Sequence, residues 1–302
     1  MPLAAGFRAL LCGFAQIFLQ QRPGFGLAVL LALLIGAPNL LGDALLGALT
    51  GNLVAQRRGY AQADIDAGLY GYNGALIGLL LSLKLSWTPL LPLLVGGLAG
   101  LSALLLQPWL RALRERQWLP AYTLPFVLVG WLLPWLSAAL ALAPAPVAQT
   151  LLTEGTWPQF AEATLRGLGQ VIFLDHPLAG LCLLLGLCLS HPRAGAWALA
   201  AAALPAALAL QAGPASPAAL AGLHGYNPVL AAIALAQLYR QPWAPLAGIL
   251  LSLLLQPGFA ALGLPALSMP FILACWLVMA SVTLLRRAAL DCAPLPGHAR
   301  NP

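Results

Sequence analysis

The sequence predicts an all-α polytopic membrane protein built from two inverted five-helix repeats. Three observations carry this prediction: the composition is strongly apolar, the apolar segments form two sets of five, and short blocks of the first set return in the second. Hydrophobic residues make up 61% of the 302 residues and charged residues only 7%, whereas soluble domains carry about 25% charged residues. This composition excludes a soluble globular enzyme. It also excludes a disordered chain, which needs low hydrophobicity and high charge.

Ten apolar segments are candidates for membrane helices. A helix needs about 20 predominantly apolar residues to span the hydrocarbon core, and several of these segments are shorter, which favours tilted or broken helices. The segments are 24–40, 42–56, 67–83, 88–106 and 124–143 in the first set, and 178–190, 194–211, 220–238, 243–256 and 270–285 in the second.

Three blocks recur in the same order, which is the signature of an internal repeat. The duplication predicts a first repeat over 1–143, a linker over 144–162, a second repeat over 163–288 and a cytoplasmic tail over 289–302. The matching pairs are 13–16 with 167–170, 68–76 with 222–230 (6 of 9 positions identical) and 119–131 with 264–276 (7 of 13 identical).

The distribution of arginine predicts that the second repeat is inverted. An odd number of spans per repeat reverses its orientation, and an excess of Lys and Arg marks cytoplasmic loops. The loops near 57–66 and 107–118 carry five arginines, whereas their counterparts near 211–217 and 256–264 carry no charged residue. Both termini are therefore expected in the cytoplasm, and only the loop that contains Lys84 runs against this pattern.

Polar residues recur at matching positions inside the apolar blocks, next to Pro and Gly. Helix-breaking segments at corresponding positions of two inverted halves point to a substrate path near the middle of the membrane. Structural roles compete with this interpretation: amides can bond neighbouring helices, hydroxyls can bond back to their own helix, and the glutamines and tyrosines can lie at the membrane interface. The pairs are Gln16 and Gln170, Asn73 and Asn227, and Thr123 and Ser268.

These blocks resemble the urea transporter family over nearly the whole chain. The resemblance rests on GLYGYNG at 68–74, GLHGYN at 222–227, RGLGQVIFLDHP at 166–177 and the two Pro-Phe blocks. It implies passive, channel-like permeation of urea, two inverted five-helix repeats with re-entrant half-helix pairs lining a central pore, and a homotrimer. For this chain it implies a bacterial inner-membrane protein that is not an enzyme.

The resemblance also assigns substrate-binding positions. Gln16 and Gln170 match residues at the two pore mouths, and Thr123 and Ser268 match a central threonine pair, with serine here replacing one threonine. The remaining positions form two slots: Leu19, Tyr72 and Leu76 in the first half, and Phe173, Tyr226 and Leu230 in the second. Leu19 stands where an aromatic ring would complete the first slot. Flat walls and a row of hydrogen-bond acceptors suit urea, which is planar and offers four N–H bonds.

Other functions find little support in the residues. The five cysteines lack metal-ligand spacing, so neither a metal nor a cofactor is expected, and the scattered basic residues do not form a nucleic-acid surface. The acidic residues lie at segment edges rather than as a buried pair, which argues against an intramembrane enzyme and against an ion-coupled transporter. A channel for ammonia or other small neutral amides remains the alternative, although His224 is matched by Tyr70 rather than by a second histidine.

Overall fold

A computed structural model describes residues 3–116, 118–145, 156–211 and 217–291. Over these residues the chain folds into helices and forms no β-strand, which confirms the all-α prediction. The first half contains α1 (Leu3–Gln16), α2 (Pro23–Gly36), η1 (Pro38–Leu40), α3 (Leu41–Arg57), α4 (Gln62–Asp66), α5 (Gly71–Lys84), α6 (Leu91–Arg116) and α7 (Leu124–Ala139). The second half contains α8 (Trp157–Gly169), η2 (Gln170–Ile172), α9 (Pro177–Ser190), α10 (Pro192–Gln211), α11 (Pro217–Leu220), α12 (Tyr226–Leu238), α13 (Trp243–Ala261) and α14 (Met269–Asp291).

Each expected apolar segment coincides with one of these helices, and proline fixes several of their starts. Proline occupies the first turn of α2, α7 and α9, where its missing N–H costs no hydrogen bond. Helix α8 begins at Trp157, inside the stretch assigned above to the linker. Residues 146–155 of that linker and 292–302 of the tail lie outside the described residues.

Only some of the described helices are long enough to cross a membrane by themselves. Three satisfy the length and hydropathy that a span requires, namely Leu91–Arg116, Trp243–Ala261 and Met269–Ala288. A fourth is added if Trp157–Ile172 and Pro177–Ser190, which meet at 76°, form one broken span. Helix α5 has 14 residues and is therefore about 21 Å long, less than the roughly 30 Å hydrocarbon core. The count of ten membrane helices therefore stays a prediction.

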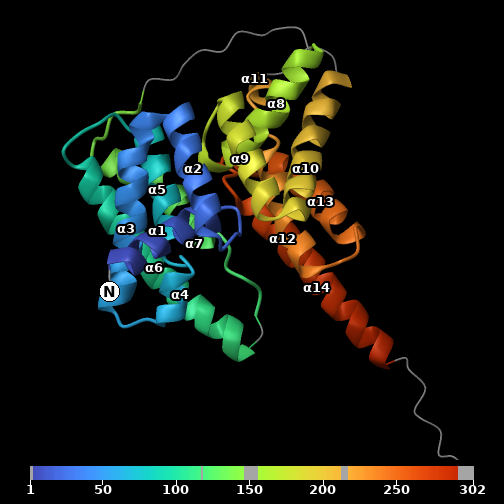
Figure 1. Cartoon of the computed structure of the whole chain (residues 1–302), viewed down its shortest axis with the longest axis horizontal. Helices are drawn as coiled ribbons and strands as arrows, with labels where there is room; N and C mark the ends of the chain where they lie inside the picture. The colour runs from blue at the N-terminus through green and yellow to red at the C-terminus, as the bar shows by residue number, and fades with distance from the viewer. Residues whose placement is uncertain (1–2, 117, 146–155, 212–216, 292–302) are drawn as a thin grey trace, which may run out of the picture.

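The two halves pack side by side, with α2 and α9 in contact between them (Figure 1). Within each half, a glycine lets two helices touch through their backbones. A Cβ at Gly26 would lie 2.0 Å from the carbonyl oxygen of Leu11, and a Cβ at Gly180 would lie 1.9 Å from that of Leu165. Any larger residue at these two positions would push α1 from α2, or α8 from α9.

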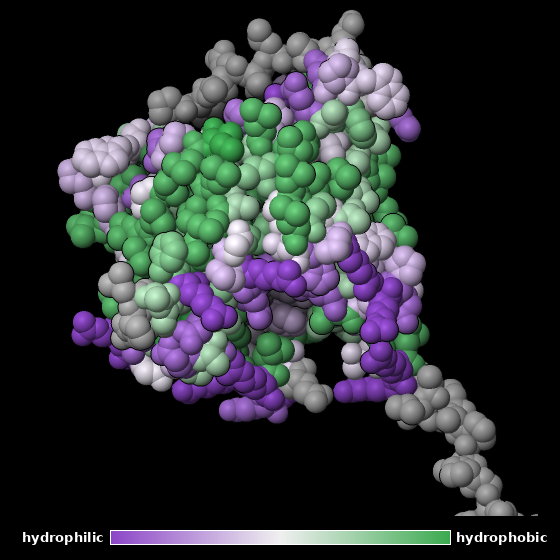
Figure 2. Space-filling view, in the orientation of Figure 1, coloured by the Kyte–Doolittle hydropathy of each residue, from purple (hydrophilic) through white to green (hydrophobic). Residues whose placement is uncertain are grey.

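The surface carries a broad apolar band, with most polar residues below it and a smaller group above it in this view (Figure 2). Leucines on the outer faces of α2, α3, α9 and α13 are about half exposed or more, for example Leu31, Leu53, Leu185 and Leu254. A water-soluble protein would not expose so much contiguous apolar surface. The band is consistent with a surface that faces lipid.

Candidate functional site

A narrow cavity lies between the two halves, where the duplicated polar blocks meet. Its volume is about 20 Å³, little more than the space that one water molecule requires. Seven of the ten substrate-binding residues expected from the sequence line it, and Gln16, Leu19 and Tyr72 do not. The lining residues are Ile17, Leu76, Thr123, Phe126, Gln170, Val171, Phe173, Tyr226, Leu230, Leu267 and Ser268.

The hydroxyl groups of Thr123 and Ser268 face each other across the boundary between the halves. Their oxygens lie 2.6 Å apart, and both side chains are buried. Each residue immediately precedes a helix whose first turn contains proline, α7 after Thr123 and α14 after Ser268. Thr123 and Ser268 thus lie just before the first helical residues, Leu124 and Met269. Their hydroxyls bond each other across the boundary.

Two buried asparagines hold the starts of α7 and α14 in place. The Oδ1 atom of Asn73 accepts the backbone N–H of Phe126 at 3.2 Å, and the Oδ1 atom of Asn227 accepts that of Phe271 at the same distance. A free helix N-terminus leaves unpaired N–H groups, and these amides satisfy one on each helix. The asparagines bond neighbouring helices, as the structural alternative proposed, and they position the segments that carry the hydroxyl pair.

The two glutamines anchor on backbone carbonyls in equivalent ways. The Nε2 group of Gln16 donates to the carbonyl of Ala67 at 3.0 Å, and that of Gln170 donates to the carbonyl of Ala221 at 2.9 Å. Three residues further on, Leu19 and Phe173 adopt left-handed backbone conformations, with φ of 59° and 62°. Such a conformation costs a non-glycine residue roughly 1–2 kcal/mol. Both halves store this strain where the chain turns between helices, a placement often associated with function.

The cavity is not centred between the halves but lies on the side of the second. Phe173 and Tyr226 both line it, and the Tyr226 hydroxyl donates to the carbonyl of Leu267 at 2.9 Å. On the first side, the Tyr72 hydroxyl donates to the carbonyl of Tyr122. Tyr122, the counterpart of Leu267, packs its ring on Phe271 with the centroids 4.8 Å apart. The first side therefore carries the larger side chain at this position, and Tyr122 does not line the cavity.

Four lining residues escaped the sequence analysis. Ile17 and Val171 each follow a predicted glutamine, and they occupy equivalent positions of the two halves. Phe126 belongs to the first Pro-Phe block and lies with its ring centroid 6.1 Å from that of Phe173. The duplication of this block could have indicated Phe126. Nothing in the sequence distinguishes Leu267 from its neighbouring apolar residues.

Two tryptophans, one on each helix that follows a hydroxyl residue, connect the two halves reciprocally. The indole N–H of Trp131 donates to the carbonyl of Pro265 at 2.9 Å, and that of Trp276 donates to the carbonyl of Pro120 at 2.8 Å. Each tryptophan lies on the helix that follows one hydroxyl residue and bonds the loop that precedes the other. The loops carrying Thr123 and Ser268 are thus held by the opposite half.

No charged side chain lines the cavity. Its polar groups are the two hydroxyls, the Gln170 amide and the Tyr226 phenol. Arg166, one turn before Gln170 on α8, is held outside the cavity by Glu162 at 3.0 Å and Asp175 at 3.3 Å. Within the described part of the chain, no three His, Cys, Asp or Glu residues gather closely enough to hold a metal ion.

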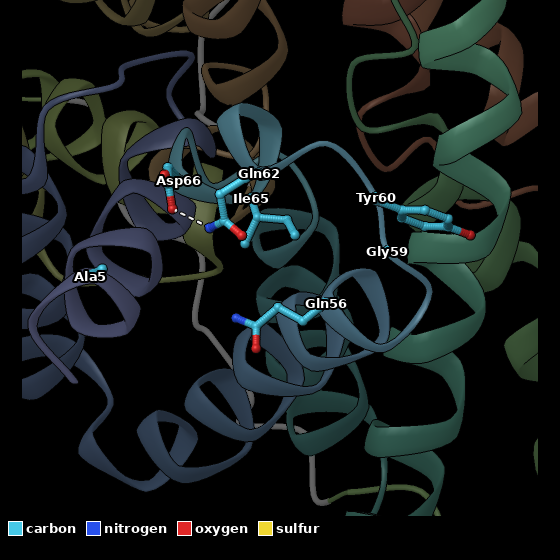
Figure 3. Close-up of a pocket in the computed structure, with 7 residues that line it drawn as sticks. All are labelled: Ala5, Gln56, Gly59, Tyr60, Gln62, Ile65 and Asp66. Carbon is cyan, nitrogen blue, oxygen red and sulfur yellow. Dashed lines mark hydrogen bonds between the residues drawn. The ribbon is translucent and has the colours of Figure 1, made fainter. Parts of the chain in front are cut away.

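A wider pocket of about 510 Å³ opens at another place, between the start of α1, the end of α3 and α4. Figure 3 shows Gln62 hydrogen-bonded to Asp66, with Gln56 below them. None of the ten predicted residues lines this pocket. Asp66 directly precedes Ala67, the residue that anchors Gln16, so the pocket lies beside the first of the two glutamine sites.

Comparison with known proteins agrees with this arrangement. The family model described as "Urea transporter" matches residues 7–283, which include nearly all of both halves and every residue of the cavity. The chain belongs to the urea transporter family.

Curated relatives in the urea transporter family extend the match. "Urea transporter 1" of Ovis aries and "Urea transporter 1" of Capra hircus are each 27% identical over 298 residues, covering 90% of this chain and 76% of their own length. "Urea transporter 1" of Rattus norvegicus is 24% identical over 243 residues, covering 76% of this chain and 62% of its own length. These relatives are transporters and not enzymes. Membership in the urea transporter family and the apolar helices identify a multi-pass membrane protein, and the family implies urea transport across membranes.

Proposed function

We propose that this protein lets urea cross the membrane passively, down its concentration gradient, through the cavity between its two halves. The observation that carries this proposal is the buried hydroxyl pair of Thr123 and Ser268, 2.6 Å apart at the meeting point of the halves. A neutral, narrow constriction with hydrogen-bond acceptors suits a small uncharged amide. It gives no ion a counter-charge to replace its hydration shell.

In this mechanism urea replaces the contact between the two hydroxyls. Each hydroxyl oxygen has lone pairs that accept an N–H of the passing solute. Gln170 is anchored through its Nε2 group, so its carbonyl oxygen is available as a further acceptor at the second mouth. Gln16 supplies the equivalent acceptor at the first mouth.

The slot walls hold the planar solute by dispersion contact. Phe173 and Tyr226 line the second slot with Leu230, while Leu19, Tyr72 and Leu76 form the first. A planar molecule gains contact on both faces only between flat walls. At about 20 Å³ the cavity is smaller than urea, so side chains on the closed first side must move during passage.

We further propose that the halves are inverted repeats, 1–143 and 163–288, joined by the linker 144–162 and followed by the cytoplasmic tail 289–302. The equivalent bonds of Gln16 and Gln170, of Asn73 and Asn227, and of the two tryptophans support a two-fold relationship. Re-entrant half-helix pairs, such as the 76° break before α9, would line the pore. The arginine distribution supports cytoplasmic termini, and the family resemblance supports a place in a bacterial inner membrane.

A homotrimer with one pore in each protomer completes the proposal. Its support is the family resemblance. Light scattering on the purified protein in detergent should give a mass of three chains after subtraction of the micelle, and a uniform monomer would contradict it.

Stopped-flow light scattering on proteoliposomes tests the transport function. Vesicles that contain the protein should re-swell in a urea gradient faster than empty vesicles, and the Thr123→Val variant, reconstituted to the same density, should be slower. Equal re-swelling of protein-containing and empty vesicles would overturn the proposal.

A channel for ammonia or other small neutral amides is the second candidate, and the cavity volume favours ammonia among these solutes. About 20 Å³ accommodates a water-sized solute without movement of the walls. A pH-sensitive dye inside the vesicles reports ammonia entry, because ammonia takes up a proton on arrival. Fast alkalinisation with slow urea flux would favour this candidate over urea.

A further inference from the structure

A second feature of the membrane-facing surface lies away from the proposed pore, in a groove between α3 and α6. The groove has a volume of about 470 Å³ and is almost entirely apolar apart from one end. Glycines form its floor, leucines and a valine form its walls, and two arginines stand at its end. The residues are Leu53, Val54, Arg57, Arg58, Gly96, Gly97, Gly100, Leu101 and Leu104.

The floor of the groove is open above Gly97. A Cβ built at Gly97 would meet no atom within 4 Å, and one at Gly96 would only touch the Thr50 hydroxyl at 3.9 Å. Leu53, in the wall, is 51% exposed, and Leu101 is 39% exposed. The groove is therefore a hollow in the apolar surface, and its volume of about 470 Å³ accommodates a chain of methylene groups.

The arginines give the groove a charged end. Arg57 and Arg58 are exposed at the C-terminal end of α3, and neither forms an ion pair with an acid among the described residues. Arginine is well suited to phosphate because its planar guanidinium binds two oxygens at once. Basic pockets beside membrane helices on the cytoplasmic side attract anionic lipid headgroups.

We propose that this groove binds one anionic glycerophospholipid. Its phosphate lies on Arg57 and Arg58, and one acyl chain lies over Gly96, Gly97 and Gly100. The chemistry of the ligand follows from the two parts of the groove, one cationic and one apolar. The inference needs only a membrane protein and does not depend on which solute the pore carries.

A second copy of this chain fits the groove less well than a lipid. A protein partner would have to bring carboxylates to the two arginines, and few are available. Five of the described acids already hold a partner within the chain: Asp43 with Ser82, Asp64 with Arg114, Asp66 with Gln62, and Glu162 and Asp175 with Arg166. A phospholipid brings its own negative charge.

Two variants test the two ends of the groove separately. Arg57→Gln with Arg58→Gln removes the charge. Gly97→Leu adds a side chain to the hollow at a position where a Cβ meets no protein atom within 4 Å. The full-length protein in detergent is titrated with palmitoyl-oleoyl phosphatidylglycerol or with the matching phosphatidylcholine, and bound lipid is counted by native mass spectrometry. Phosphatidylglycerol should bind the wild type in preference to phosphatidylcholine. The double arginine variant should bind phosphatidylglycerol about thirtyfold more weakly, since each basic residue contributes about 1 kcal/mol to the attraction of anionic lipid. The Gly97→Leu variant should lose phosphatidylglycerol binding.

Matched controls come from elsewhere on the chain. Arg286→Gln with Arg287→Gln removes the same charge from the exposed end of α14, and Gly42→Leu adds the same side chain to an exposed glycine of α3 with no atom near its Cβ. Both controls should retain the lipid. Thermal unfolding curves identify any variant that fails to fold. If the double arginine variant or Gly97→Leu fails to fold, lipid binding by the other of these two variants tests the proposal.

Three results would overturn the proposal. The first is equal binding of the two lipids by the wild type. The second is an equal loss in the variants and their controls, which would mean attraction to the whole surface. The third is a change in oligomeric mass with Gly97→Leu while lipid binding stays the same, which would assign the groove to a second copy of the chain.

Discussion

The side-chain oxygens of Thr123 and Ser268 lie 2.6 Å apart, although 145 residues separate them in the chain. Each stands at the start of a proline-containing helix that a buried asparagine holds from the neighbouring helix. A constriction built in this way depends on both halves, because neither half contains more than one of the two hydroxyls. The following predictions test whether this contact and its surroundings control permeation.

Thr123→Val and Ser268→Ala should each slow urea flux about tenfold. Removing one hydroxyl from a dehydrated constriction leaves a urea N–H without an acceptor, which costs roughly 1–3 kcal/mol, and about 1.4 kcal/mol corresponds to a tenfold change in rate. Stopped-flow light scattering on proteoliposomes measures the flux.

Ser102→Ala is the matched control for the loss of a buried hydroxyl. Ser102 is fully buried in α6 and bonds back to the carbonyl of Ala99 at 2.7 Å, outside the cavity. Its removal should leave urea flux within about twofold of wild type. If Thr123→Val and Ser268→Ala behave as Ser102→Ala does, the hydroxyl pair has only a structural role.

Phe173→Leu should reduce the discrimination between urea and dimethylurea about two- to tenfold. An aromatic contact contributes about 0.5–1.5 kcal/mol beyond its area, and the variant replaces one flat wall of the second slot. Leucine already occupies the equivalent left-handed position at residue 19, so the backbone should tolerate the change. The measurement is the ratio of the two fluxes, and an unchanged ratio would remove Phe173 from the path.

Tyr122→Leu should raise urea flux severalfold. The substitution gives the first side the residue that Leu267 supplies on the second, and it removes the ring that packs on Phe271. Loss of buried ring contacts should also lower the melting temperature. Flux and thermal unfolding are measured on the same preparation. A destabilised variant with wild-type flux would show that the first side does not limit permeation.

Asn227→Leu should destabilise the protein more than Asn73→Leu. Asn227 makes two hydrogen bonds, to the N–H of Phe271 and, through Nδ2, to the carbonyl of Leu267 at 3.0 Å. Asn73 makes the first of these bonds, but its Nδ2 group has no acceptor among the described residues. The difference should be about 1 kcal/mol, the net contribution of one hydrogen bond. Thermal unfolding in detergent compares the stabilities of the two variants. Equal losses of stability would contradict a stabilising role for the second hydrogen bond of Asn227.

Urea flux should be independent of sodium and of a pH gradient between about pH 6 and 8. None of the eleven residues that line the cavity is an acid, a histidine, a lysine or an arginine, and coupling to an ion generally requires a buried ionisable group. Flux is measured with and without each gradient. Accumulation of urea against its own gradient when a proton gradient is imposed would refute passive permeation.

The sequence predicted the helical class and the position of each apolar segment because apolar length and proline breaks act locally. Seven of the eleven residues that line the cavity were also expected. Duplication marked the polar ones, such as Gln170 and Ser268, and the family resemblance supplied the apolar and aromatic ones. The off-centre position of the cavity could not be predicted. Leu267 lines the cavity and its counterpart Tyr122 does not. That difference follows from how the two side chains pack in three dimensions, which the local sequence does not determine.

The lengths of individual helices were harder to predict for a physical reason. Helices α5 and α12 are almost entirely buried within the protein, so their sequences are apolar on every face and give no period that marks where they end. Tyr72 and Leu19 show a similar limit. Their positions correspond to Tyr226 and Phe173 of the second slot, yet neither residue lines the cavity, and the Tyr72 hydroxyl bonds the carbonyl of Tyr122 instead.

The reciprocal bonds of Trp131 and Trp276 have a consequence for biosynthesis. The carbonyl of Pro120 is translated long before its partner, the indole of Trp276 in the last helix. During synthesis the first half therefore waits in the bilayer with this carbonyl unpaired, and its loop is held by Tyr72 and Asn73 of the same half. A ribosome that stops before α14 leaves a membrane-inserted product in which the cross-connection from Trp276 never forms.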